Sequence, residues 1–198
     1  MRFRKKLAAV LSATIILFVS TPLESRSTNI IYTVSISAEA QYMSEWCWAA
    51  CARMAGKTMY NASSRSQFAV VNLLKGDALD PYPNVGGFIE DGVAGSKYVA
   101  YYHRSFDYYS SIWGFTSIQN HISQGKPVQT YMDKNVPGGA SGSHALIIYG
   151  TAHAEDSSGS HYYIAYIDPI DGATHYLSYS EFCNSNAYTY RETIYVSN

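Results

Sequence analysis

One cysteine lies where a thiol is easily made into a nucleophile. Cys47 stands near the start of an alanine-rich stretch, residues 46–54, that has neither glycine nor proline and stops at Gly56. This composition predicts a buried helix. The first turn of a helix carries a partial positive charge and unpaired N–H groups, and both stabilise a thiolate. The N–H of Cys47 and the amide of Gln41, six residues earlier, are the expected donors to an oxyanion beside the sulfur.

A histidine and an aspartate complete a possible catalytic set. His144 opens an apolar run that predicts a strand, and Asp168 ends the next predicted strand, just before Pro169. Because a hairpin brings the start of one strand beside the end of the next, the two side chains should meet. We expect Asp168 to accept the Nδ1–H of His144, which leaves Nε2 for Cys47.

Other residues compete for these roles. The chain has five further histidines: His103, His121, His153, His161 and His175. His175 is the strongest rival because it begins a strand just after the turn that contains Asp168. Asp171 is the alternative to Asp168 as the partner of the histidine. The alternative for Gln41 is an ordinary surface residue without a catalytic role.

The remaining cysteines leave two possibilities open. Cys51 lies one helical turn after Cys47, so it is either a buried core thiol or the disulfide partner of Cys183. In the second case Cys47 is the unpaired thiol, as a reactive cysteine should be. No cysteine or histidine pair has the spacing of a zinc site, so we expect no metal and no cofactor.

The ordered set of motifs resembles a known family. Its members in this sequence are Gln41, Cys47-Trp48, His144 preceded by Gly142-Ser143, and Asp168-Pro169. Weaker similarities are Asn84-Val85-Gly86-Gly87, Gly125-Lys126-Pro127-Val128 and Ser180-Glu181-Phe182. From Gln41 to Phe182 the chain looks like a compact bacterial papain-like cysteine peptidase, in the branch with effector proteases and bacteriocin leader peptidases.

The resemblance implies a function and a set of site residues. It implies a Cys-His-Asp triad of Cys47, His144 and Asp168, with Gln41 as oxyanion donor. It also implies substrate contacts by Trp48, Gly86, Gly87 and Ser143. Glu45-Trp46 replaces the Cys-Gly-Ser/Ala-Cys approach to the nucleophile of plant and lysosomal papains. Those enzymes place histidine about 130–150 residues after cysteine, whereas the gap here is 97. Both differences, and Asp168 in place of asparagine, favour the smaller bacterial branch.

The predicted secondary structure that must position these residues changes from helices to strands along the chain. Helices are predicted at residues 46–54, 64–75, 88–102 and 116–123, and the first two are followed by glycine. Strands are predicted at residues 30–37, 128–132, 144–149, 162–167, 175–179 and 188–196. Residues 80–87 form a proline- and glycine-rich loop. Helices before an antiparallel sheet indicate an α+β, papain-like fold, with the active-site cleft between the helical half and the β-sheet.

The N-terminus predicts export. Four basic residues within positions 2–6 precede an apolar stretch at residues 7–19, which is typical of a secretory signal peptide. We place it at residues 1–26 and a single domain at residues 27–198. The domain holds nine basic and fourteen acidic residues, a net charge of −5, which argues against nucleic acid. No second apolar run approaches membrane length, so we expect a secreted, extracellular monomer without membrane contact after signal removal.

The expected activity is hydrolysis of protein or peptide substrates. The same thioester chemistry leaves two other enzyme classes open. One is a cell-wall peptidoglycan amidase or endopeptidase, and the other is a transamidase. A third alternative is a tyrosine-rich binding module without enzyme activity. Only residues 27–40 separate the signal from Gln41, which is too short for an inhibitory pro-domain. We therefore expect restraint, if any, by a separate inhibitor protein.

Overall fold

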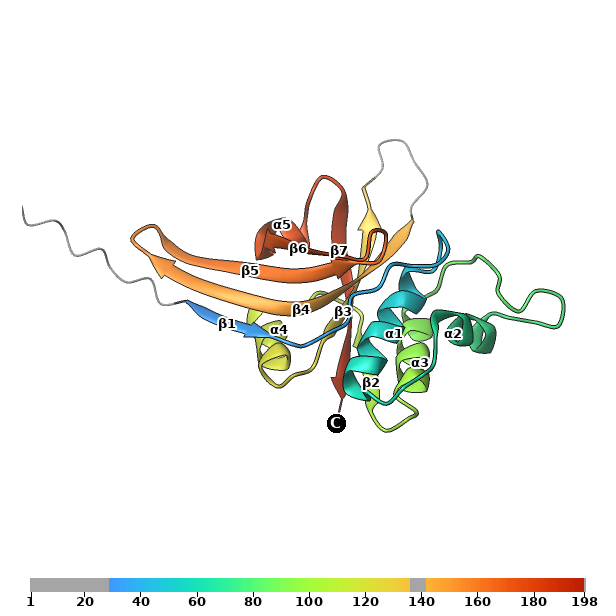
Figure 1. Cartoon of the computed structure of the whole chain (residues 1–198). Coiled ribbons are helices and arrows are strands. Elements are labelled where there is room, and N and C mark those ends of the chain that lie inside the picture. The colour runs from blue at the N-terminus through green and yellow to red at the C-terminus, as the bar shows by residue number, and fades with distance from the viewer. Residues whose placement is uncertain (1–28, 136–141, 198) are drawn as a thin grey trace, which may run out of the picture.

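Helices come first in the chain and strands dominate its second half. The computed structural model describes residues 29–135 and 142–197 (Figure 1). The helices are α1 (Cys47–Met59), α2 (Gln67–Leu74), α3 (Ile89–Val99), α4 (Phe115–Ser123) and α5 (Tyr179–Cys183). The strands are β1 (Ile30–Thr33), β2 (Ser105–Tyr109), β3 (Val128–Lys134), β4 (Ser143–Asp156), β5 (Gly159–Asp168), β6 (Ala173–Ser178) and β7 (Tyr188–Ser197). The predicted signal peptide lies outside the described residues.

The described strands form one antiparallel sheet. Its order is β2-β7-β3-β4-β5-β6, and β1 pairs with the second half of β4. The first half of β4 pairs with β3, with Val128 opposite Ile148. Figure 1 shows that α1, α2 and α3 gather at one end, while the long β4–β5 hairpin extends away from them. The end of the sheet at which β4 begins and β5 ends therefore lies toward the helices.

The first half of strand β4 is buried on both faces of the sheet. Ala145 and Ile147 belong to the core that includes α1 and α3, whereas Leu146 and Ile148 belong to a second core with residues of α4 and α5. Successive side chains on a strand point to opposite faces. The continuous apolar run of β4 is the pattern of a strand covered on both sides. This covering gives the residue that opens the run, His144, a rigid support.

Helix α1 is longer than predicted. It continues through Gly56 to Met59, so the expected end at Gly56 is wrong. A Cβ added to Gly56 would lie 2.6 Å from the Cβ of Val99 and 2.7 Å from the Ser96 carbonyl oxygen. Gly56 therefore serves close packing of α1 against α3 rather than helix termination.

The predicted helix starts are also shifted. The hydroxyl of Ser66, not Ser64, caps α2 by accepting the Ala69 N–H at 3.3 Å. Helix α4 begins after Gly114, one residue before the predicted start, and has no side-chain cap. The sequence also did not predict β2 or α5. Ser178 ends β6 and caps α5 by accepting the Glu181 N–H.

The main architectural prediction is confirmed. N-terminal helices pack on a C-terminal antiparallel sheet in an α+β fold. Within the described parts of the chain, no helix has both the length and the apolar character needed to cross a bilayer.

Candidate active site

Cys47 is the first residue of α1 and is partly exposed. The first bond along this helix runs from the Ala50 N–H to the Trp46 carbonyl, at 2.9 Å. The N–H groups of residues 47–49 therefore have no partner inside the helix. No side chain among the described residues caps this end of α1. The Cys47 N–H is thus free to bind an anion beside the sulfur, and its role as oxyanion donor stays a prediction.

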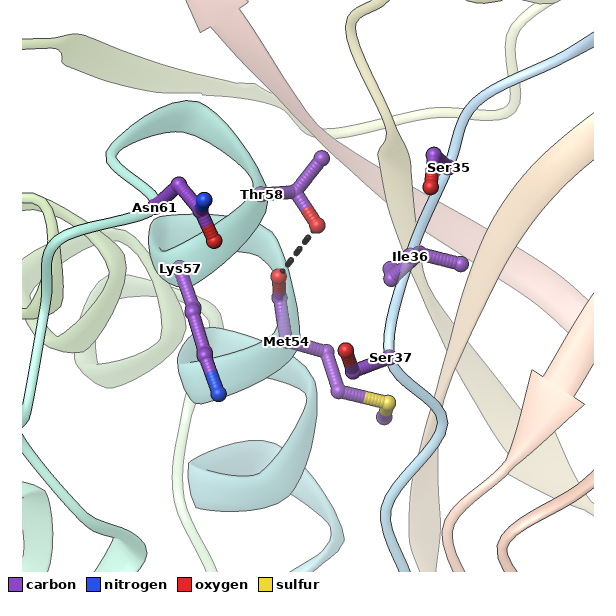
Figure 2. A pocket seen from close by; sticks show the side chains of 7 residues that line it. All are labelled: Ser35, Ile36, Ser37, Met54, Lys57, Thr58 and Asn61. Atoms are coloured by element: carbon purple, nitrogen blue, oxygen red, sulfur yellow. Dashed lines mark hydrogen bonds between the residues drawn. The ribbon is translucent and has the colours of Figure 1, made fainter.

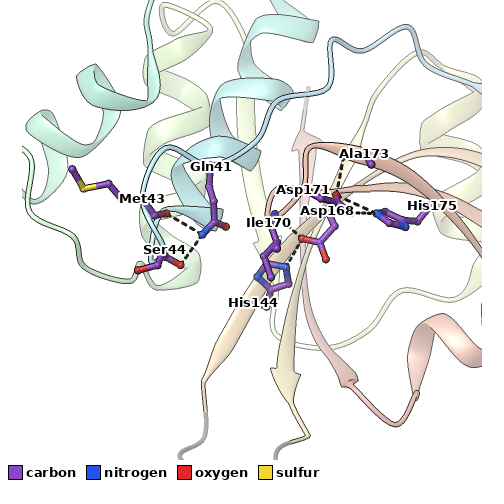
Figure 3. Close-up of polar contacts among 9 residues, drawn as sticks. All are labelled: Gln41, Met43, Ser44, His144, Asp168, Ile170, Asp171, Ala173 and His175. Atoms are coloured by element: carbon purple, nitrogen blue, oxygen red, sulfur yellow. Dashed lines mark hydrogen bonds and ion pairs between the residues drawn. The ribbon is translucent and has the colours of Figure 1, made fainter.

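His144 and Asp168 meet at the end of the sheet nearest the helices. His144 is the second residue of β4 and is 2% exposed, and Asp168 is the last residue of β5. Their Nε2 and Oδ1 atoms lie 2.8 Å apart (Figure 3). The same Oδ1 accepts the Ile170 N–H at 2.9 Å, which fixes the carboxylate. The predicted pairing of the two side chains is present.

The orientation predicted for the imidazole is wrong. Nε2, rather than Nδ1, faces Asp168. The ring of Tyr188 stacks on the imidazole, with centroids 5.3 Å apart and planes at 25°. Because Nε2 is occupied, Nδ1 is the nitrogen left for the thiol. The sequence could not show this, since the choice of nitrogen depends on the direction from which α1 approaches the sheet.

The surroundings of His144 favour its protonated form. Burial alone would lower the pKa of His144, but hydrogen bonds to Asp168 and Cys47 and the charges of both groups raise it to about 9. His144 therefore carries both ring protons at neutral pH. The structure thus brings Cys47 of α1, His144 of β4 and Asp168 of β5 into one connected set.

Gln41 anchors the segment that precedes the nucleophile. Its Nε2 donates to the carbonyl oxygens of Met43 and Ser44 at 2.9 and 2.6 Å (Figure 3). Its backbone N–H donates to the carbonyl of Pro169 at 2.7 Å, which joins this segment to the turn behind Asp168. Its Oε1 is buried and has no partner among the described residues. Both amide hydrogens are engaged, so donation to an oxyanion requires that one of them be shared. That role stays a prediction.

Gln67 supports the same segment, and sequence analysis missed it. Gln67 is fully buried. Its Oε1 accepts the Tyr42 N–H at 3.1 Å, and its Nε2 donates to the Ala40 carbonyl at 2.9 Å. These bonds fix the backbone on both sides of Gln41. Gln67 lies near the start of a predicted helix, and nothing in the local sequence signals this long-range contact.

Two tryptophans hold the loop of residues 83–87 against α1. The indole N–H of Trp46 donates to the Pro83 carbonyl at 2.9 Å, and that of Trp48 donates to the Val85 carbonyl at 3.1 Å. A Cβ on Gly87 would lie 2.5 Å from the Trp48 ring, so only glycine fits there. Trp48 is itself fully buried. The prediction that Trp48 contacts substrate is therefore wrong, and its role is to support the loop.

Gly86 lies at the surface of this loop. The loop is also held by Asn84, whose Oδ1 accepts the Glu45 N–H at 3.0 Å and whose Nδ2 donates to the Ser44 hydroxyl at 3.0 Å. A Cβ on Gly86 would meet nothing closer than Glu45 Oε2, at 4.0 Å. Ser143, beside His144, is likewise exposed. Substrate contact by Gly86, Gly87 and Ser143 stays a prediction.

The rival histidines have other neighbours. His175 pairs with Asp171 at 3.0 Å, so the expected alternatives to His144 and Asp168 pair with each other. The remaining contacts are His161 with Asp156, His153 with Glu155, His121 with Trp113 and His103 with Tyr60. Figure 3 shows the His175–Asp171 pair next to the His144–Asp168 pair.

The three cysteines are all free thiols. Cys51 is buried in the core with α1 and α3, and burial raises its pKa well above the ordinary value. Cys183 packs against the second core, and burial raises its pKa too. The disulfide alternative is therefore wrong, and Cys51 fills the core.

Two hollows lie near α1. One of about 300 Å³ opens between α1 and residues 35–37 (Figure 2). Its lining comprises Ser35, Ile36, Ser37, Met54, Lys57, Thr58 and Asn61, and so includes none of the three site residues. The other, of about 400 Å³, is lined by Glu39, Ala40, Gln41, Tyr42, Arg53 and Ser66. No group of three potential ligands that could hold a metal occurs within the described residues.

Comparison with known proteins identifies the family of the chain. Residues 32–197 match the model of the Peptidase_C39 like family, a span that includes Cys47, His144 and Asp168. No curated protein matches the sequence. The family is one of papain-like cysteine peptidases related to the bacteriocin-processing peptidases, so the resemblance noted in the sequence is confirmed. The chain belongs to the Peptidase_C39 like family and is a cysteine-type peptidase.

Proposed function

We propose that this protein is a secreted cysteine peptidase whose triad is Cys47, His144 and Asp168. The observation that carries the proposal is the placement of His144 between Asp168 and Cys47, with its pKa raised to about 9. A protonated imidazole beside a thiol at the start of a helix stabilises the thiolate. Export is supported by the basic head and apolar stretch at residues 2–19.

The first half of the reaction forms a thioester. The Cys47 thiolate attacks the scissile carbonyl carbon, and the negative charge moves to the carbonyl oxygen. The Cys47 N–H binds this oxyanion, and Gln41 contributes a second donor by sharing one of its amide hydrogens. As the carbonyl reforms, the C–N bond breaks and His144 gives its Nδ1 proton to the leaving amine. Asp168 holds the ring through Nε2 and stabilises its positive charge.

The second half returns the enzyme to its starting state. Neutral His144 takes a proton from a water molecule through Nδ1 as the water oxygen attacks the thioester. The C–S bond then breaks, which releases the carboxylic acid and restores the Cys47 thiolate beside the imidazolium. No further reactant is needed.

Substrate backbone is bound along the loop that α1 supports. The backbone groups of Gly86 have no hydrogen-bond partner among the described residues. An extended peptide has N–H and C=O groups to pair, so Gly86 and Gly87 offer it a docking edge. Ser143 lies on the opposite side, next to His144, where it faces the leaving portion of the substrate.

The proposal is tested by thiol labelling combined with peptide cleavage. Iodoacetamide at neutral pH should modify Cys47 in preference to Cys51, which is buried, and to Cys183, whose pKa is raised by desolvation. Cys47→Ala should lose both labelling at this position and turnover of a peptide library, whereas Cys183→Ser should keep both. Cleavage by Cys47→Ala at the wild-type rate would refute the assignment. Mass spectrometry of the protein from the culture medium tests export and the processing expected near residue 26.

A further inference from the structure

We infer that Glu45 makes this peptidase prefer substrates with arginine or lysine at the residue whose carbonyl Cys47 attacks. The inference rests on the proposed function, because it concerns the same cleft. The observation behind it is a single carboxylate, two residues before the nucleophile, that no contact within the protein uses.

The backbone of Glu45 is held firmly. Its N–H donates to Asn84 Oδ1 at 3.0 Å, and the next residue, Trp46, is fully buried and bonded to the Pro83 carbonyl. The side chain then extends over the glycine loop, where Oε2 lies 4.0 Å from the position of a Cβ on Gly86. Glu45 thus presents a negative charge at the surface of the glycine loop, two residues before the nucleophile in the chain.

The carboxylate of Glu45 is unpaired. Glu45 is exposed, and its carboxylate has no hydrogen bond or ion pair with any described residue. By contrast, Asp168 bonds to His144, Asp171 to His175 and Asp91 to Lys75. A fixed backbone with a free charged group at its tip is suited to meet a ligand rather than to stabilise the fold.

The segment that contains the glycine loop adds further negative charge. Residues 77–91 contain four carboxylates, on Asp77, Asp80, Glu90 and Asp91, and neither lysine nor arginine. Asp91 pairs with Lys75 at 2.7 Å, so these two charges cancel and the other three carboxylates remain. A cleft with one sign of charge attracts ligands of the opposite sign and repels those of the same sign.

The reach of the substrate selects the position. With its carbonyl at Cys47 Sγ and its oxygen at the Cys47 N–H, the attacked residue has its Cα beside the segment that precedes α1. Because Glu45 Oε2 lies over Gly86, which has no side chain to block the approach, we expect a long side chain from there to reach the carboxylate. Arginine adds two parallel hydrogen bonds to the carboxylate. A short neutral side chain gains nothing from Glu45, and an acidic one is repelled.

The test compares peptides that differ only in this residue. Fluorogenic substrates carry arginine, its uncharged isostere citrulline, or glutamate. In the wild type, kcat/KM for arginine should exceed that for citrulline by about two- to fivefold, as expected for an exposed charge pair. Glu45→Gln should bring this ratio to about one, and Glu45→Lys should favour glutamate over arginine. Because each ratio is taken within one variant, differences in the amount of active protein cancel.

Glu155→Gln is the matched control. Its carboxylate is 61% exposed near the end of β4, so the substitution removes one surface charge away from the loop. The arginine preference should survive it. If wild type and Glu45→Gln cleave the peptides with equal ratios, the inference is overturned while the peptidase function stands. If no peptide is cleaved and iodoacetamide does not label Cys47, the proposed function fails and this inference fails with it.

Discussion

Asp168→Asn removes the negative charge beside His144 but keeps an oxygen at residue 168 that accepts the hydrogen bond from the imidazole. Asp168 Oδ1 receives both the His144 Nε2–H at 2.8 Å and the Ile170 N–H at 2.9 Å. The amide oxygen of asparagine can receive both, so the ring keeps its anchor and loses only the neighbouring negative charge. The carboxylate helps to raise the pKa of His144 to about 9. Without it, we expect this pKa to fall by about one to two units, the scale for a charge at this separation.

The expected loss of activity depends on pH. With a pKa of about 9, roughly nine-tenths of His144 is protonated at pH 8, whereas with a pKa of about 7.5 roughly a quarter is. At about pH 6.5 both proteins are at least roughly nine-tenths protonated. The deficit of the variant in kcat/KM should therefore grow about three- to fourfold between these two pH values, on top of any constant loss. The deficit grows toward high pH because the imidazolium loses its proton as pH rises, and the variant with the lower pKa loses it first.

The assay is the pH profile of kcat/KM for a peptide substrate, from about pH 5.5 to about pH 9.5. The alkaline limb should lie near pH 9 in the wild type and move to lower pH in Asp168→Asn. Asp171→Asn is the control, since that carboxylate contacts His175 instead, and it should leave the limb in place. An unshifted limb in Asp168→Asn would show that the carboxylate charge does not hold the proton on His144.

Further predictions concern stability. Because the pKa of His144 is raised to about 9, its stabilising effect is complete below about pH 6.5 and is lost as pH rises through 9. The free energy of unfolding should fall over that range by roughly 3 kcal/mol more in the wild type than in His144→Gln, measured by urea denaturation at several pH values. Gln67→Leu leaves two backbone groups without partners and should cost about 1–3 kcal/mol in the same assay, and an unchanged midpoint would contradict the role of Gln67. Gly87→Ala forces a Cβ to within 2.5 Å of the Trp48 ring and should cost about 1–3 kcal/mol, whereas Gly86→Ala should leave the thermal midpoint unchanged.

The nearness of His144 and Asp168 was predictable because hairpin topology forces it. Two strands joined by a turn place the start of the first opposite the end of the second, whatever side chains they carry. The start of α1 was predictable for a similar reason, since alanine-rich composition and the absence of glycine and proline are local signals. The helix and strand order then implied the α+β architecture.

The rest depends on contacts between distant segments. Gly56 looked like a helix end, but the close approach of Val99 makes it an interior packing position. Trp48 follows the nucleophile, yet its orientation beneath Gly87 is set by a loop far along the chain. The nitrogen of His144 that faces Asp168 depends on where α1 sits relative to the sheet. None of these features has a local sequence pattern that would reveal it.

The alignment of the nucleophile with its base depends on how the helical half is held against the sheet. Cys47 belongs to a helix and His144 to the sheet, so a shift of one half against the other would separate them. Besides the core that α1 and α3 share with the sheet, the Gln41 N–H bond to the Pro169 carbonyl, 2.7 Å long, ties the segment before α1 to the turn after β5. Gly172 in that turn has a φ of +66°, and a Cβ there would lie 2.7 Å from the Ala40 nitrogen. Glycine is thus required at this position for two reasons, the positive φ and the close approach of Ala40. The turn that follows Asp168 therefore also contacts the segment that leads to Cys47, and so helps to hold the nucleophile near the His144–Asp168 pair.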